Sequence, residues 1–305
     1  MRRFIVKRLL LAIVTLIGIS FIVFVAARLT GDPALLMVPS TATDEQVQEM
    51  RAQLGLDRSI PVQYGIFLKN AVTGDFGMSL RYDQPAIKLA LKRLPATLEL
   101  VAYAFILGLI FGVLLGIVAA TRPGSVQERA GTGFAMLGLA VPGFWLAIVL
   151  MIIFSVKLHW LPTSGRESAA ARVLPTISVA WVSLAQIMRV TRSSMLEVLG
   201  SDYIKMARIK GLSERAVRWK HALRNAFVPI MGMSGFLFAM LIGGLAFVES
   251  IYRWPGIGSL LIEAVFARDF PLVQAGVLLV SAIVIAINLV VDVLFGVIDP
   301  RIRYE

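Results

Sequence analysis

Residues 189–229 read RVTRSSMLEVLGSDYIKMARIKGLSERAVRWKHALRNAFVP, and this stretch decides the fold. It is the longest polar interruption in the second half of the chain, and strongly apolar runs lie on both sides of it. It holds nine lysines or arginines against three acidic residues, a net charge of +6. Apolar runs joined by a basic loop are typical of a membrane protein that keeps this loop in the cytoplasm.

Two short helices joined at Gly211 are predicted within this stretch. Asp202 is placed to cap the first helix, whose apolar side chains are those of Tyr203, Ile204, Met206, Ala207 and Ile209. Gly211 then ends that helix, because glycine adopts a positive φ at low cost. Ser213 is a good N-cap for the second helix, and Glu214 lies in its first turn, where the helix dipole favours an anion. Ala207 and Gly211 are four residues apart, so we expect a shallow notch on one face that another protein approaches closely.

Composition also indicates a membrane protein. Of 305 residues, 58% are hydrophobic, and the mean hydropathy is +0.80, whereas about half apolar is usual for a soluble domain. The net charge of +11 does not indicate a nucleic-acid partner, because the basic residues cluster beside apolar runs instead of forming one basic face. The absence of cysteine excludes disulfides, thiolate metal sites and a cysteine nucleophile. The two histidines, His159 and His221, are too far apart in sequence for a local metal motif.

Six apolar runs are long enough to cross a membrane: about 9–27, 96–120, 131–156, 173–188, 227–248 and 274–298. Val141-Pro142-Gly143 is expected to kink the third span. A cleaved signal peptide is the rival interpretation of the first run, but its length is close to the ~20 residues that a span needs. Seventeen lysines or arginines lie on the side of the basic loop against five in the short outer loops, so both termini are predicted to be cytoplasmic.

Residues 29–95 are polar enough to lie outside the membrane. Thr43 and Gln46 have the form of a capping box, and Ser59 marks a second helix start. Residues 85–94 suit a helix at the membrane interface before the second span. The predicted divisions are a first transmembrane helix with a basic N-terminus (1–28), an external helical segment (29–95), and a five-helix core (96–305) whose loop covers about 189–226.

The run DYIKMARIKGLSERAVRWKHALRNAFVP resembles the cytoplasmic EAA loop of ABC-importer permeases, the segment that docks onto the ATPase subunits. Ala207, Gly211 and Leu223 fall on the general pattern. The departures, at Lys205, Met206, His221 and Arg224, resemble the version found in dipeptide, oligopeptide and nickel permeases. The same family is indicated by GDP at 31–33, GDFG at 74–77, RLPATLEL at 93–100, and PGIG followed by RDFP at 255–271. The resemblance therefore covers nearly the whole chain.

This resemblance implies an all-α polytopic permease subunit in the bacterial cytoplasmic (inner) membrane, with six transmembrane helices and both termini inside. Its implied partners are a second homologous permease in a heterodimer, two ATP-binding subunits, an external solute-binding protein and the lipid bilayer. The substrate would be a di- or oligopeptide, with nickel chelates, glutathione and opine-like compounds as alternatives. ATPase coupling would fall to Asp202, Tyr203, Ala207, Arg208, Lys210, Gly211, Ser213, Glu214, His221 and Arg224.

No chemistry is predicted for the chain itself. It contains no G-x-x-x-x-G-K-[ST] run and no glycine-lysine pair, so we expect ATP and Mg²⁺ on the partner subunits and no cofactor or metal here. A stand-alone secondary transporter is the remote alternative, and it would need ionisable groups or broken helices repeated in two halves. An intramembrane enzyme is less favoured still, since no paired carboxylates or Ser-His arrangement fall within the spans.

Two sets of residues keep two interpretations each. Four polar groups lie in or near the spans, where charge is costly: Glu99, Glu249, Asn288 and Asp292. The last two either line the translocation path or form a structural hydrogen-bonding pair, and we favour the structural pair. The glycines at 108, 112 and 116 in the second span, and at 232, 235, 243 and 244 in the fifth, permit close helix packing or line a pore.

Overall fold

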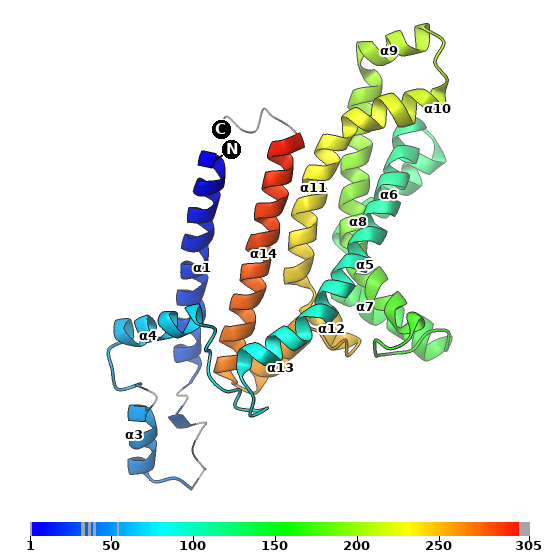
Figure 1. Ribbon diagram of the computed structural model, residues 1–305. Coiled ribbons are helices and arrows are strands. Elements are labelled where there is room, and N and C mark those ends of the chain that lie inside the picture. The colour runs from blue at the N-terminus through cyan, green and yellow to red at the C-terminus, as the bar shows by residue number, and fades with distance from the viewer. Residues whose placement is uncertain (1, 32–33, 36–37, 39–40, 54, 299–305) are drawn as a thin grey trace. The chain divides into compact units, whose positions relative to one another are not determined.

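The computed structural model describes residues 2–31, 34–35, 38, 41–53 and 55–298 (Figure 1). Its helices divide into two compact units. One unit takes Thr97–Trp254 and the chain from Ile287 onward, and the other takes Arg2–Ala96 and Pro255–Ala286. Asp32 and Pro33 of the GDP motif, and the terminal Arg301 and Arg303, lie outside the described residues.

The unit that begins at Arg2 contains α1 (Arg2–Thr30), α3 (Asp44–Gln53), α4 (Ile60–Val72), the start of α5 (Ala86–Thr121), α13 (Ile257–Phe266) and most of α14 (Phe270–Ile298). The predicted capping box is confirmed, since the Thr43 amide donates to Gln46 Oε1 at 3.0 Å and the Gln46 amide to Thr43 Oγ1 at 3.4 Å. The helix after Ser59 is also present, although the Ser59 hydroxyl makes no capping bond. The external location of this part stays a prediction.

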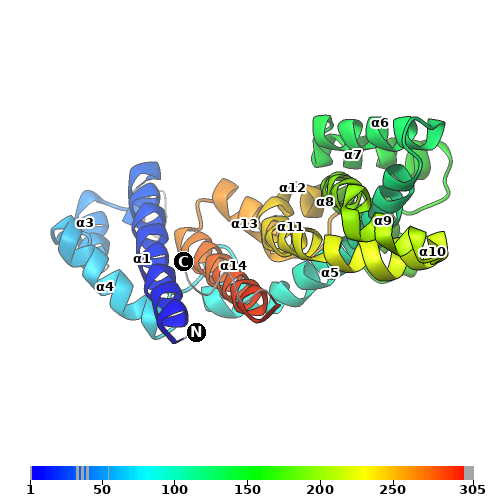
Figure 2. The same ribbon diagram turned by 90° about the horizontal axis from the view of Figure 1, so that it is seen from above.

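The unit that holds Thr97–Trp254 is built around α8 (Ala169–Gly200). It also contains the rest of α5, then α6 (Val126–Ala140), α7 (Gly143–Leu150), η1 (Met151–Lys157), α9 (Asp202–Ile209), α10 (Glu214–Ala216), η2 (Val217–Ala222), α11 (Leu223–Gly244) and α12 (Ala246–Ile251). Figure 2 shows α8 between α6 and α11, and Figure 1 shows α9 and α10 at one end of α8 with α7 and α12 toward the other. Of the most apolar stretch of α8, 61% is buried, against 33% or less in the other spanning helices, so α8 is the centre of this unit.

Five described helices have the length and composition of membrane spans. They are Ile5–Leu29, Ala86–Thr121, Ala169–Gly200, Glu214–Gly244 and Phe270–Val293. The remaining run, the third along the chain, is a broken pair of helices, Val126–Ala140 and Gly143–Lys157, bent by 104°. The predicted kink at Pro142 is therefore a full break, because Val141 and Pro142 both adopt extended backbone (ψ 117° and 138°) before α7 restarts.

Three predicted boundaries were wrong because the helices continue past the polar or helix-breaking residues that suggested an end, Pro95 among them. Residues 85–94 are not a separate interfacial helix but the first turns of the 36-residue α5, which continues through Pro95. Residues 189–200, predicted as loop, belong to α8. The second short helix of the basic loop is the start of a continuous helix, Glu214–Gly244.

Candidate functional site

The polar segment that joins α8 to the helix beginning at Glu214 is shorter than predicted and comprises residues 201–213. It consists of α9 and the turn that leads to α10. Its N-cap is Ser201, not Asp202: Ser201 has extended backbone, and its hydroxyl donates to the Val198 carbonyl at 2.5 Å. Asp202 instead lies in the first turn, where its carboxylate pairs with Lys205 Nζ at 2.8 Å on the exposed surface. Both serine and aspartate are good caps, so sequence alone misplaced the start by one residue.

Helix α9 has two apolar faces that point in different directions. Ile204 and Ala207 are buried, and Ile204 belongs to a core cluster with Met195 and Val217. The predicted notch at Ala207 and Gly211 is therefore wrong for Ala207, whose methyl group packs inward against this chain. The other apolar side chains of the helix, which we call the α9 ridge, are exposed: Tyr203 (46%), Met206 (53%) and Ile209 (77%).

The turn after α9 depends on Gly211. Its φ of +80° lies in the left-handed region, and its amide donates to the Arg208 carbonyl at 2.9 Å. A Cβ built on Gly211 would meet nothing within 4 Å, so backbone conformation and not crowding requires the glycine. Leu212 follows, and its amide donates to the Ala207 carbonyl at 3.3 Å.

Charged side chains tie the two sides of this turn together. The Ser213 hydroxyl accepts from the Ala216 amide at 3.3 Å, which confirms the predicted N-cap. Glu214 accepts from Arg208 Nε at 2.8 Å and lies 3.7 Å from Arg218 Nε. These pairs are exposed, so each contributes little to stability. Together they connect the end of α9 to the start of the helix that follows it.

The remaining residues that the resemblance assigned to coupling do not all gather here. Lys210 is exposed within the turn, beside the ridge. His221 and Arg224 lie further along, in η2 and α11; the His221 carbonyl accepts from Asn225 Nδ2 at 2.9 Å, and Arg224 is exposed. The structure therefore brings together the residues from Asp202 to Glu214 and leaves these two on the following helix.

At the same end of the unit, an ion pair joins α8 to α6. Arg192 donates to Glu128 Oε1, and Glu128 Oε2 accepts from the Gly124 amide at 2.6 Å. Ser125 caps α6 by accepting from the Glu128 amide at 3.2 Å. This pair could not be predicted from the sequence, because its partners are 64 residues apart.

The other end of the unit holds two of the polar groups noted in the spans. Glu99 on α5 pairs with Arg166 and, at 3.4 Å, with Arg172, which anchors the loop after η1. Glu249 is fully buried and accepts from the Thr97 hydroxyl at 2.6 Å. Asn288 is exposed and Asp292 is partly buried, and both interpretations of that pair stay predictions.

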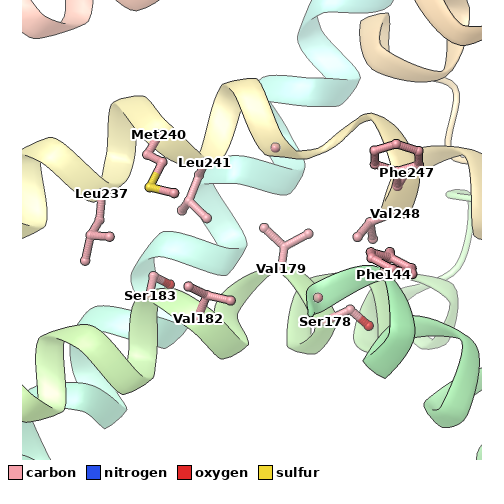
Figure 3. A pocket seen from close by; sticks show the side chains of 12 residues that line it. Phe144, Ser178, Val179, Val182, Ser183, Leu237, Met240, Leu241, Phe247 and Val248 are labelled. Atoms are coloured by element: carbon pink, nitrogen blue, oxygen red, sulfur yellow. The ribbon is translucent and has the colours of Figure 1, made fainter. Parts of the chain in front are cut away.

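A cavity of about 200 Å³ lies between α8 and α11, near α7 and α12 (Figure 3). Its walls are mainly apolar, and they include Val179, Val182, Leu237, Leu241, Phe144 and Phe247. Sequence reasoning missed this cavity, because apolar residues within apolar spans carry no sign of which ones enclose a space.

Residues 112–304 match the family described as the binding-protein-dependent transport system inner membrane component, and residues 1–101 match the N-terminal part of such membrane components. The chain belongs to this family. Among its relatives is a protein of Brucella abortus named putative peptide transport system permease protein, 39% identical over 314 residues. Another is the glutathione transport system permease protein of Escherichia coli K12, 40% identical over 306 residues. In both cases all of this chain and all of the relative are covered.

Solved structures show the same fold. The MetNI methionine ABC transporter in inward-facing conformations aligns with a TM-score of 0.58 at 19% identity, over 69% of this chain and 96% of the solved one. An amino acid ABC transporter crystallised with histidines aligns with a TM-score of 0.53 at 16% identity, over 70% and 94%. The chain is a multi-pass permease subunit of an ABC importer, which confirms the resemblance seen in residues 202–229.

Proposed function

We propose that this permease forms part of a translocation path for di- or oligopeptides, and that separate ATPase subunits drive it by docking on the α9 ridge. The observation that carries the docking role is the exposure of Tyr203, Met206 and Ile209 on a short helix whose opposite side is packed against this chain. Apolar side chains clustered on an exposed helix mark a contact surface for another protein. The surrounding basic residues favour a cytoplasmic location for this end of the unit.

The peptide substrate is supported by relatives that carry peptide and glutathione transport in their names. Glutathione is itself a short peptide, so the two names indicate one chemical class. Nickel chelates and opine-like compounds are the second choice. We further propose the bacterial inner membrane, a heterodimer with a second permease, two ATP-binding subunits that hold ATP and Mg²⁺, and an external solute-binding protein. The coupling roles of Asp202, Arg208, Lys210, Gly211, Ser213, Glu214, His221 and Arg224 belong to this proposal.

Family membership leaves no support for a stand-alone secondary transporter. The mechanism we propose is mechanical. ATP-driven closure of the ATPase dimer displaces α9, and the buried contacts of Ile204 pass that displacement to the helices on either side. Alternating access would then result from movement of the spans that α9 connects.

Met206→Glu tests the docking role. A buried charge at an interface is costly, and apolar anchors typically contribute more than about 1 kcal/mol, so co-purification of the ATPase subunits should fall at least about fivefold. Met206→Leu keeps the volume and the apolar surface and is the matched control. Unchanged ATPase recovery and unchanged ATP-driven uptake in Met206→Glu would contradict docking at the ridge.

Because any side chain at Gly211 strains its φ of +80°, Gly211→Ala is the control for a second probe of the same surface, Gly211→Trp, which adds bulk in open space. Gly211→Trp should uncouple ATP hydrolysis from uptake while the protein still inserts into the membrane. Ala207 is unsuitable for this purpose, since a large side chain there would disrupt the packing of this chain itself.

A further inference from the structure

The cavity between α8 and α11 has the chemistry of an apolar subsite. Its volume of about 200 Å³ is below the roughly 300–1,000 Å³ of pockets that hold whole small ligands, so it fits a part of a ligand such as one side chain. In Figure 3, Val179 and Val182 of α8 approach the cavity from one side, and Leu237 and Leu241 of α11 from the other. No charged side chain is among the described residues that line it.

The two hydroxyl groups in the lining are already engaged. Ser178 donates to the Leu174 carbonyl at 2.8 Å, and Ser183 donates to the Ala180 carbonyl at 2.9 Å. Ser178 also lies 3.3 Å from the hydroxyl of Tyr252, which itself donates to the Ala147 carbonyl at 2.8 Å. Because both hydroxyls already donate within the chain, this cavity offers few partners to a charged or strongly polar group, whereas an apolar side chain needs none.

The position of the cavity links it to the polar segment. Its two main walls, α8 and α11, are the helices between which α9 is inserted. One buried cluster runs from Ile204 on α9 through Val217 and Ile230 to Leu237, and Leu237 is also part of the cavity wall. Displacement of α9 therefore reaches the cavity through continuous side-chain contact.

We propose that this cavity receives an apolar side chain of the transported peptide during its passage. This inference rests on the proposed peptide-importer function and adds to it a preference for apolar residues within the membrane part. The peptide backbone and its charged termini would lie outside the cavity. A lipid acyl chain and a side chain of the second permease are the competing occupants.

Two neighbouring glycines provide a matched pair of variants. Gly244 lines the cavity and Gly243 does not, yet a Cβ at either position meets nothing within 4 Å. Gly244→Leu fills the cavity, and Gly243→Leu adds the same side chain elsewhere on the same turn. The complete transporter in proteoliposomes is then supplied with its binding protein and with radiolabelled dileucine or diglycine.

Gly244→Leu should lower ATP-driven uptake of dileucine about tenfold or more relative to diglycine, and Gly243→Leu should leave that ratio unchanged. An equal fall for both peptides in Gly244→Leu, or an unchanged ratio, would overturn the inference. If the wild-type transporter takes up neither peptide, the proposed substrate class itself fails, and the two failures are thereby distinguished.

Thiol protection gives a second measurement that does not depend on a filled cavity. The chain has no cysteine, so Val182→Cys supplies a single thiol in the cavity and Phe236→Cys a control thiol, exposed on α11 outside it. Dileucine, and not diglycine, should slow maleimide labelling at position 182 several-fold and leave position 236 unaffected. Two outcomes would overturn the proposal and assign the cavity to lipid or to the second permease. One is that position 182 is protected from labelling in the absence of peptide, and the other is that dileucine does not change its labelling rate.

Discussion

The glycines of α5 lie in close helix contacts, whereas those at the end of α11 border open space. A Cβ on Gly112 would lie 2.9 Å from the Ile187 side chain, and one on Gly116 would lie 2.5 Å from Thr191 Cβ and 2.8 Å from the Met188 carbonyl oxygen. Gly243 and Gly244 meet nothing within 4 Å. The first set lets α5 and α8 approach backbone to backbone, as small residues do in membrane helices, and the second leaves space.

This difference divides the unit around α8 into a tight part and a loose part. Gly138 on α6 adds a further close contact, since a Cβ at this position would collide with Ala185 Cβ. Helices α5, α6 and α8 therefore pack as one block, while the far end of α11 borders the cavity. Relative motion within this unit should concentrate where α11 and α12 meet α8, not inside the block.

The largest effect is expected from Gly116→Ala. The added methyl group collides with Thr191 and with main-chain oxygen that cannot rotate away, and overpacking of this kind costs about 1–3 kcal/mol or more. A denaturant titration of the purified transporter in detergent would show the loss of stability. A stability equal to that of the wild type would mean that the helices are not closely packed at this point.

A smaller effect is expected from breaking the pair between Arg192 and Glu128. Both side chains are partly exposed, so Arg192→Glu should cost about 1–2 kcal/mol, between the values typical of surface and buried pairs. The double variant Arg192→Glu with Glu128→Arg should recover part of that loss. A double-mutant cycle measures the recovery. A coupling energy of zero between the two positions would mean that this ion pair does not hold α6 against α8.

The smallest effect, of opposite sign, is expected from Gly243→Ala. With no crowding at this position, the change should stabilise the helix by up to about 1 kcal/mol through the better helix propensity of alanine. The same titration applied to Gly116→Ala and Gly243→Ala compares one chemical change in two surroundings. Shifts of equal sign and size would erase the distinction between the tight and loose parts.

Sequence was most informative where the rules are local. The turn at Gly211, the cap at Ser213 and the capping box at Thr43 depend on residues within one helical turn, and all three were predicted. The six apolar runs and the family motifs also settled the class of protein. The positions of α8 and of the helix from Glu214 were misjudged because both helices continue past the apolar layer on charged residues that favour helix as well as loop.

Properties that depend on contacts between distant residues were beyond sequence reasoning. Ala207 and Met206 are adjacent and both apolar, yet the tertiary packing of α9 buries the first and leaves the second exposed. The glycines kept two interpretations for the same reason: a pore and a close contact require the same residue. The contact with α8 decides for close packing at Gly116, whereas both interpretations of Gly243 stay predictions.

The break between α6 and α7 has a consequence for water. The 15 residues of α6 rise about 22 Å, less than the ~30 Å thickness of a hydrocarbon core. A helix of this length that starts at the membrane surface ends within the apolar layer, and the break then lies there. Carbonyl groups at the end of one helix and amides at the start of the next need hydration or protein partners there. Gly143 and Phe144 begin α7 and also border the cavity, so we expect water or a partner's polar groups on that side of it. In the proposed passage, the peptide backbone would stay hydrated at this point while an apolar side chain enters the cavity.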